Sequence, residues 1–240
     1  MITSHLIDIP SYFVDEGKRL RVSAFMELAQ QIAEDNSEAL GFGYNALIAK
    51  NDVWVLSRMQ MRFTDMPRFK DKVRFESWHA GVEGPLFIRD YEMLSADGEP
   101  VVVANSSWAI MDIDSRAVQR PDRFDIPAES LGRPSRLASS PKKIRIPADA
   151  VLEGSFSHAV VYSDVDYNHH VNNTRYVVWA MDCLGDAVKG EVTEVNVNFN
   201  HEIAPGVNAE ILRYRAGNTY YVDIRENGTC AFLASFVMRP

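Results

Sequence analysis

The sequence predicts an α+β protein in which one unit, a helix followed by antiparallel strands, occurs twice in tandem. Two observations support this fold class. Segments of alternating apolar residues recur 136 positions apart (59 to 195 and 63 to 199), and such alternation is typical of half-buried strands. A helical pattern of apolar residues precedes each of these segments. The paired strand positions are Met59 and Val195, Met61 and Val197, and Phe63 and Phe199.

The composition is that of an ordinary globular protein. Of the 240 residues, 46% are hydrophobic and 24% are charged. No apolar stretch approaches the ~20 residues of a membrane helix, and a net charge of −8 disfavours binding to nucleic acid. Two cysteines, Cys183 and Cys230, are too few for a disulfide framework, and the N-terminus lacks the pattern of a secretion signal. We therefore expect a cytoplasmic protein that binds neither nucleic acid nor a membrane.

The first unit is expected to span residues 1–125. A short strand near Tyr12–Val14 is predicted to lead into a helix with Ser23 as its N-cap and Gly41 as its stop. Further along, Asp97-Gly98 is a typical hairpin turn and precedes an apolar run. The apolar stripe of the helix consists of Phe25, Leu28, Ala29, Ile32 and Ala33.

The second unit is expected to span residues 150–240 and to repeat this plan. A strand at Ala159–Tyr162 precedes a helix that Asn172 or Asn173 caps and Gly185 ends. A hairpin turn follows at Asn227-Gly228. The residues of this helix that are expected to face inward are Tyr176, Val177, Ala180, Met181 and Leu184.

A linker expected at residues 126–149 connects the two units and carries a cluster of positive charge. Its central part is rich in proline, glycine and serine, which favours an irregular connection. Two interpretations are open, a solvated connection or a docking patch for an acidic partner. The cationic residues are Arg133, Arg136, Lys142, Lys143 and Arg145.

The segment Tyr162–Asn173, directly before the second helix, concentrates two carboxylates, two imidazoles and three carboxamides. The matching segment of the first unit has no counterpart of Asn168 or His170. In addition, Met66 stands where the second unit has Glu202. If folding required these polar groups, both units would carry them, so we interpret them as functional.

Several polar residues of this segment also have purely structural interpretations. Asn168 suits a turn, Asn173 suits a helix cap, and we expect His169 to be scaffold. A metal site is disfavoured because adjacent histidines rarely bind one ion and no Cys-x-x-Cys or His-x-x-x-His pattern is present. We therefore expect neither a metal nor another cofactor. The residues that could supply metal ligands are Asp166, His169, His170 and Glu202.

The motif Asp166-x-Asn168-x-His170-Val-Asn-Asn, followed by Tyr176 and Trp179, resembles the acyl-acyl-carrier-protein (acyl-ACP) thioesterases of plant plastids and bacteria. The resemblance extends over nearly the whole chain. It implies a tandem double hot-dog fold, in which each unit is a helix wrapped by a curved antiparallel sheet. Because the chain begins directly in the first unit, without a plastid transit segment, the resemblance points to a bacterial member.

The resemblance also assigns site residues by position. The family's catalytic aspartate, asparagine, histidine and glutamate fall on Asp166, Asn168, His170 and Glu202. Plant members commonly carry a cysteine after the glutamate, whereas this chain has Ile203 there. A cysteine nucleophile is therefore not expected at this position, and the four polar residues alone would carry the chemistry.

The function implied is hydrolysis of fatty acyl-ACP to free fatty acid, a thioester hydrolase activity of fatty acid biosynthesis. Glu202 and His170 would activate the water, while Asn168 and Asp166 would orient the reactants. The partner would be acyl-loaded carrier protein, the acyl tunnel would lie in the first unit, and the enzyme would be a monomer or homodimer. The alternatives are a non-catalytic acyl-binding protein, and an acyl-coenzyme A thioesterase or hydratase. The first-unit residues considered for acyl contact are Met26, Trp54, Met59, Met61 and Phe63.

Overall fold

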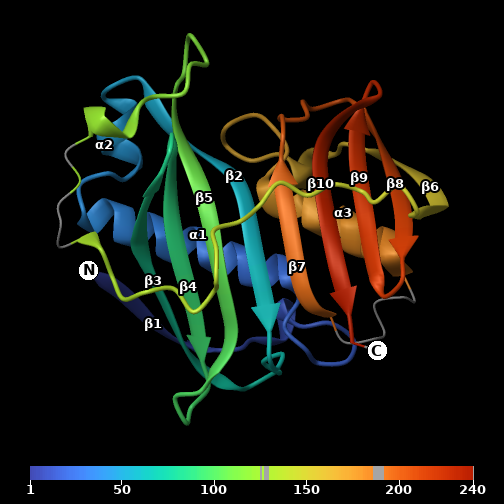
Figure 1. The fold of residues 1–240 in the computed structure, drawn as a ribbon, viewed down its shortest axis with the longest axis horizontal. Helices are drawn as coiled ribbons and strands as arrows, with labels where there is room; N and C mark the ends of the chain where they lie inside the picture. The colour runs from blue at the N-terminus through green and yellow to red at the C-terminus, as the bar shows by residue number, and fades with distance from the viewer. Residues whose placement is uncertain (125, 127–129, 186–191, 240) are drawn as a thin grey trace. The chain divides into compact units, whose positions relative to one another are not determined.

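The computed structural model describes residues 1–124, 126, 130–185 and 192–239, which form two compact units, Met1–Pro141 and Lys142–Pro240 (Figure 1). In the described residues, each unit combines one long helix with an antiparallel sheet, as the sequence predicts for an α+β repeat. The division between the units falls within the expected linker. Residue 125 and residues 127–129, at the expected boundary, lie outside the described part of the chain.

The sheet of the first unit has the strand order β1-β3-β4-β5-β2. Helix α1 packs against β1 and β3. The strands are β1 (Ile2–Asp8), β2 (Asp52–Phe63), β3 (Lys72–Glu83), β4 (Leu86–Leu94) and β5 (Pro100–Asp112). The helices are α1 (Val22–Ala39) and α2 (Tyr44–Ile48), with short 3₁₀ turns η1 (Ser11–Phe13) and η2 (Pro121–Arg123).

The sheet of the second unit has the strand order β7-β10-β9-β8-β6, and helix α3 packs against β8, β9 and β10. The strands are β6 (Val151–Ala159), β7 (Val192–Phe199), β8 (Asn208–Ala216), β9 (Thr219–Glu226) and β10 (Thr229–Met238). The helix is α3 (Asn173–Leu184), and a 3₁₀ turn η4 (Tyr162–Asp164) precedes it.

The two long helices form where the apolar stripes predict them. In α1 the predicted cap was wrong, because Arg21 occupies the N-cap position and Ser23 is buried inside the first turn. The predicted stop is confirmed. Gly41 has a φ of 79°, and its N–H donates to the carbonyl of Glu38 at 3.0 Å.

Helix α3 begins and ends with caps of the predicted kinds. The Asn172 side chain accepts the N–H of Thr174 at 2.9 Å, so Asn172 is the N-cap and Asn173 lies in the first turn. Gly185 takes a φ of 53° at the C-cap. Met181, which was predicted to face inward, is only half-buried.

The strand segments of the repeat and both hairpin turns are confirmed. The alternating residues 59–63 lie in β2 and residues 195–199 lie in β7. Asp97-Gly98 joins β4 to β5, and Asn227-Gly228 joins β9 to β10. Asn227 and Gly228 have φ values of 49° and 78°, the positive pair that a tight type I′ turn requires.

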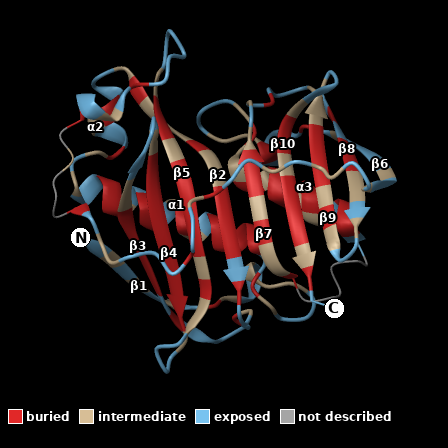
Figure 2. Ribbon diagram, viewed as in Figure 1, coloured by how far each residue is buried: buried red, intermediate tan, exposed pale blue. Residues whose placement is uncertain are grey.

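The strands predicted directly before the helices were wrong. The segment near Tyr12–Val14 contains the 3₁₀ turn η1, and Ala159–Tyr162 contains only the end of β6 and the start of η4. The true strands lie earlier, at β1 and β6, and each forms one edge of its unit's sheet. Side chains of β6 are mostly exposed (Figure 2), so its sequence lacks a clear apolar alternation.

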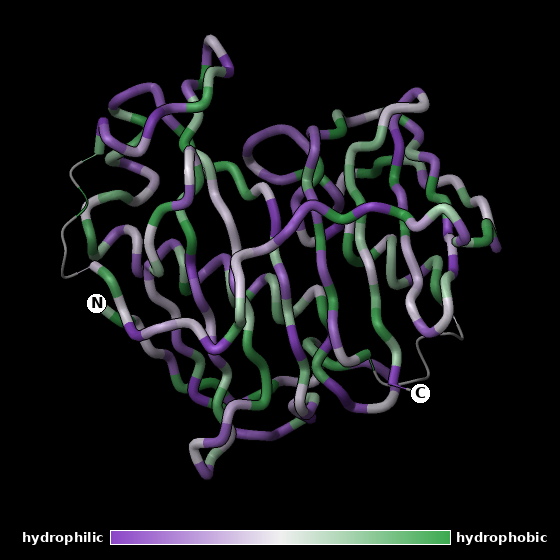
Figure 3. The backbone as a smooth tube through the Cα atoms, in the orientation of Figure 1, coloured by the Kyte–Doolittle hydropathy of each residue, from purple (hydrophilic) through white to green (hydrophobic). Residues whose placement is uncertain are grey.

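Strand β4 and the middle of β3 are buried, and yet hydrophilic segments occur within both strands (Figures 2 and 3). Glu76 of β3 lies directly opposite Glu92 of β4. Arg133, in the chain that crosses this face, contacts both carboxylates, with Nη2 2.8 Å from Oε2 of Glu76. Arg136 Nε lies 2.9 Å from Oε1 of Glu92. The arginines offset the repulsion between the two carboxylates and fasten residues 130–141 to the sheet.

No helix in the described ranges is long and apolar enough to cross a membrane.

Candidate functional site

A tight turn before α3 holds the polar segment. The backbone N–H of Asp166 donates to the carbonyl of His170 at 3.1 Å, and the N–H of His169 donates back to Asp166 at 3.0 Å. His169 adopts a φ of 63° at the tip of the turn and is exposed. Val165 and Val171 close the turn as an isolated β-bridge. These backbone bonds therefore fix the position of the His170 Cα, from which its side chain extends.

The Asp166 carboxylate fixes this turn and the helix cap together. Its Oδ1 accepts the backbone N–H of Asn168 at 2.9 Å. Its Oδ2 accepts the side-chain amide of Asn172 at 3.1 Å. Because Asn172 in turn caps α3, a single carboxylate links the turn to the start of the helix.

His170 and Glu202 approach each other across the site. Nε2 of His170 lies 3.7 Å from Oε1 of Glu202, which is ion-pair range but longer than a hydrogen bond. The two side chains are 27% and 38% exposed, so water has access to both. Glu202 follows β7, and the carbonyl of the next residue, Ile203, accepts the N–H of Val171 at 3.1 Å. That backbone bond brings the segment after β7 to the turn before α3.

Asn168 lies in the same turn, between Asp166 and His170. Its residue is exposed, and its backbone N–H is bound to Asp166. Within the described residues, no hydrogen bond joins the Asn168 carboxamide to His170 or Glu202. Of the four predicted site residues, the structure thus places Asp166 beside Asn168 and His170 beside Glu202.

The N-terminus of α3 points its first N–H groups toward the turn. The N–H of Thr174 is bound by the Asn172 side chain, and the N–H of Arg175 by the Asn172 carbonyl at 2.9 Å. In the part of the chain that the structure describes, the N–H of Asn173 makes no hydrogen bond. This N–H lies at the positive end of the helix dipole and is a ready donor for a developing negative charge.

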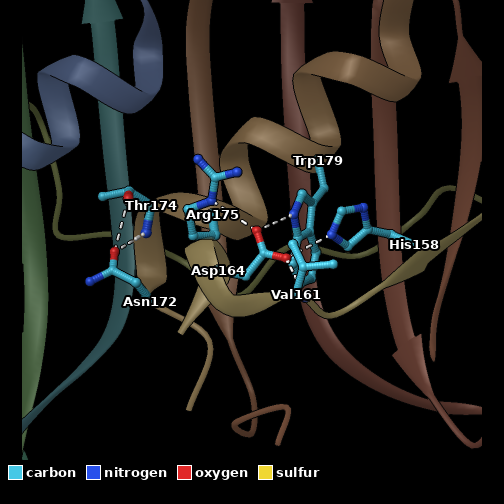
Figure 4. Close-up of polar contacts among 7 residues, drawn as sticks. All are labelled: His158, Val161, Asp164, Asn172, Thr174, Arg175 and Trp179. Atoms are coloured by element: carbon cyan, nitrogen blue, oxygen red, sulfur yellow. Dashed lines mark hydrogen bonds and ion pairs between the residues drawn. The ribbon is translucent and has the colours of Figure 1, made fainter. Parts of the chain in front are cut away.

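Asp164 is a fully buried carboxylate two residues before Asp166 that the sequence reasoning did not single out (Figure 4). It accepts Nε2 of His158 at 2.8 Å and Nε of Arg175 at 3.0 Å. It also accepts the N–H of Val161 at 3.0 Å and the indole N–H of Trp179 at 3.3 Å.

Desolvation alone would raise the pKa of Asp164. The hydrogen bonds from His158, Val161 and Arg175 outweigh burial and lower that pKa below its ordinary value. Asp164 is therefore an anchor of the turn held in its charged form. The sequence indicates this anchoring role only weakly, through an aspartate at position 164 and an arginine eleven residues later, at position 175.

The first unit contains the same turn with different chemistry. The N–H of Asp15 donates to the carbonyl of Arg19 at 2.8 Å, and Lys18 takes a φ of 62°. Arg19, at the position of His170, pairs with Asp15 at 3.1 Å, and Met66 stands in place of Glu202. The backbone of the turn belongs to the repeated fold, whereas the imidazole–carboxylate pair belongs to the second unit alone.

Cys183 lies in the last turn of α3, at the opposite end of the helix from the turn that carries His170. Burial raises the pKa of the Cys183 thiol to about 12, which leaves it protonated and unreactive. Among the described residues, no group of three or more histidine, cysteine, aspartate or glutamate side chains is arranged to hold a metal ion.

Comparisons with known proteins show which families and structures this chain resembles. Residues 2–124 match the model of the acyl-ACP thioesterase N-terminal domain, and residues 153–231 match that of the C-terminal domain. An oleoyl-acyl carrier protein thioesterase of Arabidopsis thaliana chloroplasts is 28% identical over 81% of this chain and 58% of its own length. A chloroplastic acyl-[acyl-carrier-protein] hydrolase of Cuphea viscosissima is 24% identical over 84% of the chain and 51% of its own length. The chain thus spans little more than half the length of these plant relatives.

Solved structures agree in fold. An acyl-ACP thioesterase from Bacteroides thetaiotaomicron superposes with a TM-score of 0.89 at 20% identity, covering 99% of this chain and 98% of that one. The 12:0-ACP thioesterase from Umbellularia californica gives a TM-score of 0.89 at 19% identity, covering 100% and 97%. The fold is the predicted hot-dog type, and the two matching domain models show that this chain belongs to the acyl-ACP thioesterase family.

Proposed function

We propose that this chain hydrolyses the thioester of fatty acyl-ACP and releases a free fatty acid. The observation that carries the proposal is the His170–Glu202 pair at 3.7 Å, partly open to water and present in only one of the two repeated units. Membership of the acyl-ACP thioesterase family supplies the substrate class. A carboxylate and an imidazole at this spacing can divide the two proton transfers that hydrolysis requires.

In the proposed mechanism, Glu202 accepts a proton from a water held between it and His170. The water oxygen attacks the thioester carbonyl carbon, and the carbonyl oxygen becomes an oxyanion. When the tetrahedral intermediate collapses, the carbon–sulfur bond breaks and His170 protonates the departing thiolate. Transfer of the proton from Glu202 to His170 then returns the pair to its starting state, and the new carboxylic acid releases its own proton to solvent. Water serves as the nucleophile because Ile203 follows Glu202 and burial raises the pKa of the Cys230 thiol to about 12.

The oxyanion is proposed to form at the N-terminus of α3. The backbone N–H of Asn173 is the donor, and the helix dipole adds a favourable field. The exposed carboxamide of Asn168 supplies a second donor from the turn. Asp166 acts through its bonds to Asn168 and Asn172, which hold the turn and the helix cap in place.

Two further features belong to the proposal. The first is acyl contact in the interior of the first unit, where the flexible side chains of Met26, Met59 and Met61 are buried. The second is docking of the acidic carrier protein at Lys142, Lys143 and Arg145, which are exposed. Arg133 and Arg136 are left out of this docking surface because they are bound to Glu76 and Glu92. The free thiols Cys183 and Cys230 fit the expected cytoplasmic location.

The proposal is tested by incubating the purified chain with acyl-ACP and acyl-coenzyme A substrates of matched chain length, while free thiol and acyl products are measured. We expect equal amounts of thiol and fatty acid, with higher kcat/KM on the carrier-bound substrate. Acyl binding without thiol release would identify a binding protein. Faster release from coenzyme A esters would identify an acyl-coenzyme A thioesterase. With an enoyl thioester as a further substrate, addition of water across its double bond without thiol release would identify a hydratase.

A further inference from the structure

Tyr176 is a buried residue of α3 whose hydroxyl reaches the segment that carries Glu202. Its side chain is 2% exposed, and its oxygen accepts the backbone N–H of Ile203 at 2.9 Å. The carbonyl of Ile203 accepts the N–H of Val171, as described above. Ile203 is therefore held at both of its backbone groups, by α3 through Tyr176 and by the residue that follows His170.

The Tyr176 ring is locked in place by aromatic neighbours. It stacks on Phe232 with ring centroids 5.4 Å apart and an interplanar angle of 24°. Burial raises the pKa of the phenol well above its ordinary value. The hydrogen bond from Ile203 opposes this rise, and the nearby Glu202 carboxylate adds to it. The hydroxyl is thus neutral and rigidly placed close to Glu202.

The first unit contains the counterpart of Tyr176 without its hydroxyl. Phe25 is the fourth residue of α1, as Tyr176 is of α3. Phe25 meets Phe63 edge-on at 6.1 Å and 78°, and Tyr176 meets Phe199 edge-on at 6.0 Å and 79°. The two rings occupy the same position in the repeated fold.

The other partner of the hydrogen bond is also missing from the first unit. Pro67 is the counterpart of Ile203, because its carbonyl accepts the N–H of Leu20 at 2.7 Å as that of Ile203 accepts Val171. Proline has no N–H to donate. The repeated fold therefore forms without either the hydroxyl or the N–H. Both appear only in the unit that has His170 and Glu202.

We propose that Tyr176 is a positioning residue for the hydrolytic site: its hydroxyl holds Ile203 and thereby fixes the Glu202 carboxylate beside His170. This inference rests on the proposed thioesterase function. It assigns Tyr176 no contact with the substrate. A small displacement of a catalytic group costs much in rate and little in ground-state binding, so the effect belongs in kcat.

The first test is Tyr176→Phe, which gives the second unit the residue that the first unit already carries. We expect kcat to fall by roughly ten- to a hundredfold with KM unchanged. Ile203→Pro copies Pro67 and removes the donor instead of the acceptor, and we expect the same loss. The control is Tyr91→Phe, which removes another buried phenol, bonded to Ser106 at 3.1 Å in the first unit, and should leave kcat unchanged.

A double-mutant cycle distinguishes positioning from general destabilisation. In a Glu202→Gln background, Tyr176→Phe should cause no further loss of kcat, because the group it positions has been disabled. If Tyr176→Phe lowers kcat by the same factor in both backgrounds, or leaves kcat of the otherwise unmodified chain intact, the positioning role is wrong.

A crystal structure of Tyr176→Phe provides a readout that does not depend on activity. We expect the Nε2–Oε1 separation of His170 and Glu202 to increase relative to the unmodified chain. An unchanged separation would overturn the inference. If the unmodified chain cleaves no thioester, the proposed function fails, and this comparison of the two structures still decides whether Tyr176 fixes Glu202.

Discussion

At the scale of single residues, His170 and Glu202 combine close approach with access to solvent. They are close enough to share one water molecule, and neither side chain is sealed from solvent. A pair needed only for stability gains little in this setting, since partly exposed ion pairs contribute about 0–1 kcal/mol. The geometry suits proton transfer better than it suits structural support.

Glu202→Gln and His170→Ala test this pair directly. Each variant removes one proton-transfer group, so we expect kcat on acyl-ACP to fall by about a hundredfold or more. Thermal unfolding should change little, because both side chains are partly exposed. Measured kcat values and melting curves of the two variants check this. A fully active Glu202→Gln protein would exclude Glu202 as the general base.

Asp90, on β4 of the first unit, makes stability depend on pH. Burial raises the pKa of Asp90 to about 6, Ser135 and Arg133 oppose the rise, and Glu92 adds to it. Between the ordinary value of 3.8 and about 6, the folded protein keeps a proton that the unfolded chain has released. The stability associated with this proton is complete below pH 3.8 and is lost as the pH rises through 6.

Asp90→Asn removes this dependence because a carboxamide does not ionise. At pH 7 the variant should have a higher free energy of unfolding than the unmodified chain, by roughly 1 to 3 kcal/mol. The difference should shrink toward zero below about pH 4. Urea unfolding of both proteins at several pH values measures it. The exposed Asp97, replaced by Asn, is the control. A difference that does not vary with pH would contradict the assignment to Asp90.

At the scale of elements, Asp164 joins three pieces of the second unit. It belongs to η4, and it binds His158 of β6 and Arg175 and Trp179 of α3. Its own carbonyl accepts the N–H of Asn172, the helix cap, at 2.9 Å. The turn that carries Asp166 and His170 therefore leaves the sheet from a fixed point.

Asp164→Ala leaves the Arg175 guanidinium half-buried beside a cavity. Removal of one partner from a buried ion pair typically costs about 3 kcal/mol or more, so we expect a loss of this order in the free energy of unfolding. His158→Gln keeps a donor within reach of Asp164 and should cost much less. Denaturant unfolding of the two variants makes the comparison. Equal losses in the free energy of unfolding would mean that the charge-assisted bond between Asp164 and Arg175 does not account for the stabilising effect of Asp164.

The elements that the sequence predicts correctly are those with a strong local pattern. The stripe of α3, the alternation of β7 and the turn at Asn227-Gly228 each carry enough signal within a dozen residues. Strands β1 and β6 escaped prediction because they are sheet edges with one hydrogen-bonded neighbour and many exposed side chains. Strand β1 pairs with β3 and strand β6 pairs with β8, both far along the chain, so no local sequence pattern indicates these pairings.

The candidate site divides in the same way. The motif from Asp166 to His170 is local and can be recognised in the sequence, and comparison with the first unit adds Glu202. The hydrogen bond between Tyr176 and Ile203 joins residues 27 positions apart. In the sequence, Tyr176 belongs to the apolar stripe of a helix and cannot be distinguished from an ordinary core tyrosine. The sequence likewise shows Arg133 only as one cation of the linker, whereas in the structure it forms ion pairs with Glu76 and Glu92.

At the scale of the whole molecule, duplication separates what the fold requires from what the chemistry requires. Both units keep the turn with a left-handed residue, Lys18 or His169, and both keep the backbone bond that follows it. Only the second unit adds His170, Glu202 and the Tyr176 hydroxyl. The first unit retains Phe25 and Pro67 and is free to use its interior for packing or for an acyl chain.

The net charge of the whole chain has the same sign as that of its proposed acidic partner. With a net charge of −8, the protein repels an acidic carrier at long range, so docking requires a local positive surface. Two arginines of the connecting segment are used to neutralise buried glutamates. Lys142, Lys143 and Arg145 are exposed and remain as the docking surface of the proposal.

Replacement of Lys142, Lys143 and Arg145 by glutamate tests this surface. Because charges at the rim of an interface act mainly on encounter, we expect KM for acyl-ACP to rise by roughly tenfold at low salt, with kcat unchanged. The effect should shrink as added salt screens the charges. A small acyl thioester without the carrier should be hydrolysed at the original rate. The matched control reverses three exposed cations of the first unit, Lys50, Lys72 and Arg123, and so produces the same change in net charge. If both triple variants raise KM equally, or if the small thioester is affected as strongly as acyl-ACP, these three residues do not form a docking surface for the carrier.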